Sequence, residues 1–177
     1  MSKDLLFELV THTPEETEAA GARLARLPAF VALYGDLGVG KTAFVRGFAS
    51  VTSPGSAVRS PTFALVNEYR RGARPVFHFD MYRIEDDDEL YSSGFYDYES
   101  RGGYCLAEWC ENIPWALPAD RIRAEISKTG NTDERRITVE HINEKENVKS
   151  KYWLLTALQK PPRRRFATAN VCLPNTH

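Results

Sequence analysis

The sequence predicts a single α/β domain, with a mostly parallel sheet flanked by helices, and three observations support this fold class. A phosphate-binding loop of the form G-x-x-x-x-G-K-[ST] occupies residues 35–42, between an apolar strand-like run at 30–34 and a helix-like run from 43. Patterns typical of strands and helices then alternate along the chain. The 177 residues, 42% hydrophobic and 27% charged, suffice for one globular core but not for two ordinary domains.

The individual elements follow from caps, periodicity and turn residues. A first helix is predicted from residue 14 to about 27, because Thr13, Pro14 and Glu16 form a capping box at its start. The other predicted elements are strands at 30–34, 63–69, 75–82, 104–108, 121–126 and 135–141, and helices at 43–48, 86–92 and from about 145 to Pro161. We therefore expect a P-loop NTPase domain over residues 1–160 and a flexible, disordered tail over 161–177.

Charge and composition exclude several classes of function. The formal net charge is −1, which argues against strong autonomous binding to RNA. No stretch approaches the ~18 consecutive apolar residues of a membrane span, and no signal-like apolar region follows the charged N-terminus. Cys105, Cys110 and Cys172 are odd in number and lack metal-binding spacing, so a reducing, cytoplasmic location is expected.

The phosphate-binding loop predicts both a ligand and part of its chemistry. Its glycines allow backbone N–H groups to point at phosphate oxygens, and the following helix adds the positive end of its dipole. Lys41 is expected to reach the β- and γ-phosphates of a nucleoside triphosphate, and the Thr42 hydroxyl to bind Mg²⁺. The loop residues expected to contact the nucleotide are Gly35, Asp36, Leu37, Gly38, Val39, Gly40, Lys41 and Thr42.

Two acids end apolar strands and are candidates, with Lys41, for the catalytic and metal-binding groups. Asp80 is expected to help Thr42 hold Mg²⁺, directly or through water; the alternative is an acid that caps a surface loop. Glu108 could orient the attacking water, join the metal's ligands, or be a solvated carboxylate. Met81 follows Asp80, so the adjacent Asp-Glu pair of fast ATPases is absent, and we expect slow hydrolysis.

Other polar patches allow more than one interpretation. Residues 60–62, Ser-Pro-Thr, suit either a loop that senses the γ-phosphate or an ordinary Ser-Pro turn. Arg83 could stabilise phosphate charge or pair with the acidic run that follows it. The histidines show no ligand spacing, so we expect them to be structural or incidental.

Four patches together resemble one family closely. Residues 35–42, 60–63 (Ser-Pro-Thr-Phe), 78–83 (His-Phe-Asp-Met-Tyr-Arg) and 108–109 (Glu-Trp) occur in the order and spacing of the bacterial TsaE (YjeE) ATPases. The resemblance covers roughly residues 5–150. These ATPases act in the biosynthesis of threonylcarbamoyladenosine (t6A) beside the anticodon of tRNAs.

The resemblance implies a compact P-loop fold with ATP and Mg²⁺ bound near Thr42, Asp80 and Glu108. It also implies that Thr17, at the start of the first helix, contacts the adenine side of the nucleotide. The expected partners are TsaB and TsaD homologues, of which TsaD transfers the threonylcarbamoyl group. ATP hydrolysis would reset the TsaB–TsaD complex between turnovers, and tRNA would be reached only through that complex.

We therefore expect a cytoplasmic, Mg²⁺-dependent ATPase that is weak alone and stimulated by its partners, with Thr62 coupling the γ-phosphate to loop order. A small-molecule kinase is a rival, although the sequence shows no arginine-rich lid insertion. A GTPase is disfavoured because no N-K-x-D motif follows the loop. A nucleotide-binding regulator that switches partners without required turnover is the rival from another class.

Overall fold

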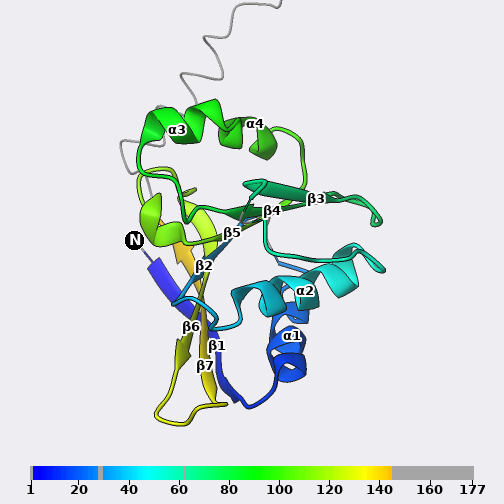
Figure 1. The fold of residues 1–177 in the computed structure, drawn as a ribbon, viewed down its shortest axis with the longest axis vertical. Coiled ribbons are helices and arrows are strands. Elements are labelled where there is room, and N and C mark those ends of the chain that lie inside the picture. Colours follow the sequence, from blue (N-terminus) through cyan, green and yellow to red (C-terminus); the bar gives the residue numbers. More distant parts are fainter. Residues whose placement is uncertain (1, 28–29, 62, 145–177) are drawn as a thin grey trace, which may run out of the picture. The chain divides into compact units, whose positions relative to one another are not determined.

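The structure, a computed structural model, describes residues 2–27, 30–61 and 63–144, and these belong to one compact unit (Figure 1). The expected helix from residue 145, the domain end at residue 160, the tail over 161–177 and Thr62 lie outside the described residues. Within the described ranges, no helix is long and apolar enough to cross a lipid bilayer.

Seven strands form one mixed sheet in the order β1-β7-β6-β2-β5-β4-β3. In chain order the strands are β1 (Ser2–Thr11), β2 (Phe30–Tyr34), β3 (Val66–Tyr69), β4 (Val76–Asp80), β5 (Tyr104–Glu108), β6 (Asp120–Lys128) and β7 (Arg135–Asn143). The β6-β2, β2-β5 and β5-β4 pairs are parallel, whereas the β1-β7, β7-β6 and β4-β3 pairs are antiparallel. The α/β class is confirmed, and the parallel arrangement is confined to the central strands.

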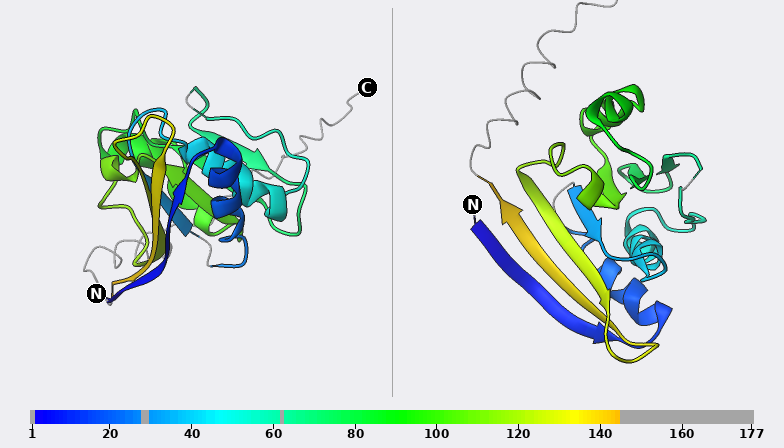
Figure 2. Two further views of the ribbon diagram at one scale, coloured as in Figure 1. Left: turned by 90° about the horizontal axis from the view of Figure 1, so that it is seen from below. Right: turned by 60° about the vertical axis from the view of Figure 1, so that its left-hand side comes forward.

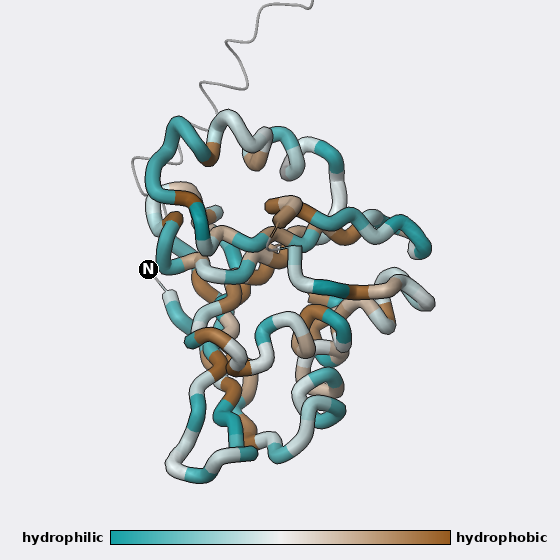
Figure 3. Tube along the Cα trace, viewed as in Figure 1, coloured by the Kyte–Doolittle hydropathy of each residue, from teal (hydrophilic) through white to brown (hydrophobic). Residues whose placement is uncertain are grey.

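Helices cover both faces of these central strands (Figure 1). The helices are α1 (Pro14–Ala22), α2 (Lys41–Thr52), α3 (Asp87–Ser92), α4 (Phe95–Glu99) and the short 3₁₀ helix η1 (Cys110–Asn112). One hydrophobic core joins α1 and α2 to the sheet, and a second joins α3, α4 and η1 to its other face. β2 supplies Val31 and Leu33 to the first core and Phe30 and Ala32 to the second, as its alternation requires. The most hydrophobic segments accordingly follow the central strands (Figure 3).

The pleat of β4 and β5 places three polar side chains on the face that α2 covers. Val76 of β4 and Leu106 of β5 belong to the core beneath α2. Side chains two residues apart in a strand share a face, so His78, Asp80 and Glu108 point to the same side. Asp80 and Glu108 are also paired in the β4-β5 register, which brings the two acids together at the C-terminal edge of the sheet.

Several predicted boundaries are wrong. The strand expected over 75–82 is Val76–Asp80, and the strands expected to end at 126 and 141 continue to Lys128 and Asn143. Two differences are larger. The first helix ends at Ala22 because the N–H groups of residues 23–25 and 27 donate to carbonyls three residues earlier, which makes tight turns and not α-helix. The strand expected from residue 63 begins only at Val66. Leu65 has a φ of 61°, in the left-handed region, and cannot continue an extended strand.

Three elements, β1, α4 and the short 3₁₀ helix η1, were not expected from the sequence. β1 is an edge strand that runs antiparallel to β7, with Ser2 opposite Asn143, so that β1, β7 and β6 lie side by side (Figure 2). Its consecutive leucines, Leu5 and Leu6, are 61% and 41% exposed, so the strand lacks the alternation by which a half-buried strand is recognised. α4 is too short to produce a helical repeat in the sequence.

Candidate functional site

The phosphate-binding loop connects β2 to α2 and takes the conformation that its glycines allow. Gly35 has a φ of 130°, and a Cβ added there would lie 2.1 Å from the carbonyl oxygen of Ile126. Any other residue at this position would therefore suffer both backbone strain and a clash. Val39 is buried and anchors the loop in the core beneath α2, whereas Asp36, Leu37 and Gly38 are exposed.

α1 brings Thr17 next to this loop. The Thr17 methyl group lies 3.5 Å from the position of a Cβ added at Gly40, the residue that precedes α2. Its hydroxyl is 3.0 Å from that of Thr11 and donates to the carbonyl of Thr13 at 3.3 Å. The residue predicted on the adenine side is thus buried beside the phosphate loop and held by the end of β1 and the start of α1.

Lys41 opens α2 and is 4% exposed. Its ammonium donates to the carbonyl oxygens of Gly35 and of Asp36, the latter at 3.0 Å, and lies 3.6 Å from the centroid of the Trp109 ring. Burial lowers the pKa of Lys41 from its usual value, and the neighbouring Glu108 carboxylate partly opposes this effect. The predicted phosphate ligand therefore lies inside the phosphate loop, between its carbonyl groups and an aromatic ring.

Trp109 has a φ of 64°, which is uncommon for a bulky residue. Its ring contacts the Lys41 ammonium on one side and the ring of Tyr82 at a centroid distance of 5.0 Å. Backbone in this region persists only where the surrounding structure holds it, and such residues cluster at functional sites. The turn places Trp109 over the loop immediately after Glu108 ends β5.

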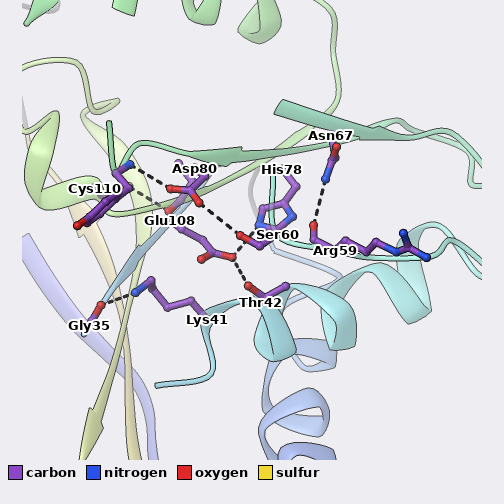
Figure 4. A network of polar contacts seen from close by, with 12 residues as sticks. Gly35, Lys41, Thr42, Arg59, Ser60, Asn67, His78, Asp80, Glu108 and Cys110 are labelled. Atoms are coloured by element: carbon purple, nitrogen blue, oxygen red, sulfur yellow. Dashed lines mark hydrogen bonds and ion pairs between the residues drawn. The ribbon is translucent and has the colours of Figure 1, made fainter. Parts of the chain in front are cut away.

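Glu108 contacts the first turn of α2. The Thr42 hydroxyl donates to Glu108 Oε1 at 2.8 Å, and the Glu108 residue is 4% exposed (Figure 4). This hydrogen bond joins Thr42 to Glu108, one of the two acids predicted to bind the metal ion. Strand β5 is the immediate neighbour of β2, the strand that leads into the loop, so the sheet order accounts for this pairing.

Asp80 is held by different partners. Its Oδ2 accepts a hydrogen bond from the Ser60 hydroxyl at 3.3 Å, and its Oδ1 accepts one from the Tyr82 N–H at 3.0 Å. Like Glu108 it is buried, with 6% of the residue exposed. Asp80 therefore joins the loop that carries Ser60 to the end of β4 (Figure 4).

His78 belongs to the same group of side chains, which the sequence did not indicate. It is fully buried, and its Nε2 lies 2.8 Å from Glu108 Oε1. The spacing His78-x-Asp80 on a predicted strand was the available signal, because it puts both side chains on one face. The sequence alone could not supply the contact with Glu108, which comes from the neighbouring strand.

The structure thus brings most of the predicted site residues to one edge of the sheet. The loop residues 35–40, Lys41, Thr42 and Thr17 lie around the start of α2, with Asp80 and Glu108 facing them from β4 and β5. Arg83 lies instead over the ring of Phe63, 5.4 Å from its centroid. Thr62 cannot be placed, because it lies outside the described residues.

The fold and the loop define the class of this protein: it has the P-loop NTPase fold, with the phosphate loop at the C-terminal edge of parallel strands. A family model described as threonylcarbamoyl adenosine biosynthesis protein TsaE matches residues 11–137. The chain belongs to the TsaE family.

Individual relatives agree with this assignment. The tRNA threonylcarbamoyladenosine biosynthesis protein TsaE of Bacillus subtilis (strain 168) is 41% identical over 131 residues, which cover 72% of this chain and 81% of that protein. The protein of the same name from Rickettsia conorii is 32% identical over 133 residues, covering 75% of this chain and 74% of the relative. The crystal structure of YdiB from Bacillus subtilis is similar with a TM-score of 0.66 at 30% identity, covering 89% of this chain and 99% of that one.

Proposed function

We propose that the chain is a Mg²⁺-dependent ATPase subunit of the t6A biosynthesis machinery. The observation that carries the proposal is the hydrogen bond from Thr42 to Glu108, with Asp80 opposite Glu108 in the register. A hydroxyl at the end of a phosphate loop and two buried acids beside it are the kind of protein ligands by which Mg²⁺ is held together with a triphosphate. Among the described residues, no three His, Cys, Asp or Glu side chains form a metal cluster, so phosphate oxygens would complete the shell.

The chain's own residues would act as follows, with Mg²⁺–ATP supplying the phosphoryl group and neutralising its charge. Lys41 exchanges the carbonyl oxygens of Gly35 and Asp36 for phosphate oxygens, and the N–H groups at the start of α2 bind the same phosphates. Thr42 and Glu108 would hold the metal ion. Asp80 would either be a further metal ligand or accept a hydrogen bond from one of the metal's water ligands.

The hydrogen bonds favour slow turnover by the chain alone. Glu108 already accepts from Thr42 and contacts His78, and Asp80 accepts from Ser60 and from a backbone N–H. A general base needs a lone pair free for the proton of the attacking water. Glu108 Oε2 takes part in neither of the bonds to Thr42 and His78, so this one oxygen would have to serve both the metal ion and the water unless the other bonds rearrange.

We infer that partner docking supplies that rearrangement. The partners would be TsaB and TsaD homologues, and hydrolysis would reset their complex, with tRNA reached only through it. We place this activity in the cytoplasm, in keeping with the free, buried thiol of Cys110.

The test is Mg²⁺-dependent ATP hydrolysis measured with and without purified TsaB and TsaD homologues, with Lys41→Ala as the control. We expect weak hydrolysis alone, stimulation by the partners, loss in Lys41→Ala and loss when EDTA removes Mg²⁺. ATP binding without any partner effect on binding or turnover would contradict the proposal. Phosphate transfer to a small-molecule acceptor would then identify the kinase alternative.

A second function, a nucleotide-dependent switch that needs no turnover, is favoured by the same hydrogen bonds, which Glu108 accepts from Thr42 and Asp80 accepts from Ser60. Glu108→Gln distinguishes the two, because the amide keeps the shape of the side chain but neither accepts a proton well nor carries the charge that holds a metal. Loss of t6A formation with ATP still bound would support required hydrolysis. Retained t6A formation would support the switch.

A further inference from the structure

His78 is a buried polar side chain for which the proposed reaction gives no role. It is fully buried on the α2 side of the sheet, between the side chains of Tyr69 and Glu108. A buried imidazole is tolerated only where its nitrogens have hydrogen-bond partners. Both nitrogens have one here, since Nε2 lies 2.8 Å from Glu108 Oε1 and Nδ1 lies 3.4 Å from the Tyr69 hydroxyl.

The chemistry of these groups sets the direction of the first bond. An ionised carboxylate can only accept, so His78 Nε2 carries the proton and donates it to Glu108. Thr42 donates to the same oxygen, Oε1, and neither bond uses Oε2. Two donors on one oxygen restrain the rotation of the carboxyl group, and the orientation of Oε2 toward a metal ion or water is thereby restrained as well.

The Tyr69 hydroxyl continues this chain of contacts to the backbone of Arg59. It lies 3.2 Å from the Arg59 carbonyl oxygen, and the Arg59 N–H donates to it at 3.4 Å. With His78 Nε2 protonated, Nδ1 can only accept, so the connection requires the hydroxyl to give its single proton to Nδ1 while it accepts from the Arg59 N–H. In this arrangement the hydroxyl connects the imidazole to the loop that precedes β3.

The two acids are therefore joined to adjacent residues of one loop. Asp80 is joined to Ser60 directly (Figure 4). Glu108 is joined to Arg59 through His78 and Tyr69. A movement of this loop away from β4 must break or lengthen both connections at once. The hydrogen-bond chain thus gives the loop a route to Glu108 that does not pass through Asp80.

We propose that His78 is a positioning residue that orients the Glu108 carboxylate and, through Tyr69, couples it to the position of the loop at Arg59 and Ser60. The proposal rests on the proposed ATPase function for its kinetic consequence. Its structural consequence, the coupling of the loop to Glu108, can be measured without hydrolysis. The imidazole itself touches neither substrate nor metal in this role.

Matched substitutions separate the role of the donor from that of the side-chain volume. His78→Leu keeps an apolar volume but removes both nitrogens, whereas His78→Gln keeps an N–H that can reach Glu108. We expect His78→Leu to lower kcat about 10- to 100-fold with KM for ATP within about threefold of wild type, as is typical when the partner of a metal-binding group is removed. We expect His78→Gln to restore most of kcat. His141→Leu, a control far from the acids, should leave kcat unchanged.

Hydrogen exchange of the Arg59 amide supplies the second measurement, because that N–H donates to the Tyr69 hydroxyl. Tyr69→Phe keeps the ring but removes the hydroxyl, so we expect faster exchange at Arg59 and a kcat lowered less than in His78→Leu. Faster exchange at Arg59 in His78→Leu as well, with the melting temperature preserved, would support the coupling.

Three results would overturn the proposal. One is wild-type kcat in His78→Leu, and another is an equal loss in His78→Gln and His78→Leu, which would indicate packing alone. The third is unchanged exchange at Arg59 in both Tyr69→Phe and His78→Leu. If wild-type protein with its partners hydrolyses no ATP, the proposed function fails instead, and the exchange measurement still decides whether His78 couples the loop to Glu108.

Discussion

A methyl group added at Gly47 tests how α1 and α2 hold the phosphate site together. Gly47 lies in the middle of α2, where a Cβ would be 1.7 Å from the carbonyl oxygen of Glu18 and 2.6 Å from its Cα. These atoms belong to the backbone of α1, so no side-chain rotation can relieve the contact. In Gly47→Ala the two helices must move apart, and they carry Thr17 at one side of the loop and Lys41 at the other.

The size of the effect follows from two opposing terms. Alanine is favoured over glycine in a helix interior by about 1 kcal/mol. Overpacking of a rigid contact costs typically 1–3 kcal/mol and here should reach or exceed the top of that range, ~3 kcal/mol, because all the nearest atoms are backbone. The net loss is therefore at least about 2 kcal/mol, which in a domain of this size lowers the melting temperature by at least about 4–8 °C.

Thermal and urea unfolding of Gly47→Ala, compared with Gly130→Ala, measure this difference. Gly130 has no heavy atom within 4 Å of an added Cβ, so the same chemical change should be neutral there or slightly stabilising. Binding of a triphosphate should weaken in Gly47→Ala and stay unchanged in Gly130→Ala. If Gly47→Ala proves as stable as wild type, the close contact of α1 with α2 cannot be as the structure has it.

Three further predictions concern the site and its surroundings. Lys41→Met should raise the melting temperature of the nucleotide-free protein at pH 7, because burial lowers the pKa of Lys41 and the charged lysine therefore destabilises the folded state. The gain in stability is full below the folded pKa of Lys41 and shrinks as the pH rises toward the unfolded value near 10.5. A lower melting temperature of Lys41→Met at pH 7 would contradict this prediction. Asp80→Asn keeps an oxygen that accepts from the Tyr82 N–H, and its NH2 group can donate to the Ser60 hydroxyl oxygen, so its melting temperature should stay close to wild type. Mg²⁺-dependent hydrolysis should fall at least about tenfold, and equal activity would remove Asp80 from the metal site. The Cys110 thiol is fully buried, and burial raises its pKa. Mass spectrometry should therefore find Cys110 unmodified by iodoacetamide at pH 8 until urea unfolds the protein. Modification of Cys110 in the folded protein would contradict its burial.

The phosphate-binding loop shows how far prediction from sequence reaches in this chain. Its residues are contiguous, and the conformation depends on local features such as the positive φ of Gly35 and the helix that begins at Lys41. The strand patterns that end at Asp80 and Glu108 were equally local, and both acids do end buried strands. Local backbone preference and the hydrophobic pattern were sufficient for these features.

The different roles of Asp80 and Glu108 could not be predicted from the sequence. Which acid meets Thr42 depends on β5, and not β4, being the neighbour of β2 in the sheet. The part played by His78 depends in the same way on the β4-β5 register and on a tyrosine from β3. No pattern within one strand contains this information, because it arises from pairing between segments that are distant in the chain.

The α/β class, the phosphate loop with its lysine and threonine, the two acids at strand ends and the resemblance to the TsaE family could all be read from the amino-acid sequence. The pairing of β1 with β7, the end of α1 at Ala22 and the connection of Glu108 to the loop at Arg59 through His78 became known only from the folded chain. The difference lies in the range of the interactions. Turn and helix geometry depend on neighbouring residues, whereas sheet order and buried hydrogen bonds depend on side chains that only folding brings together.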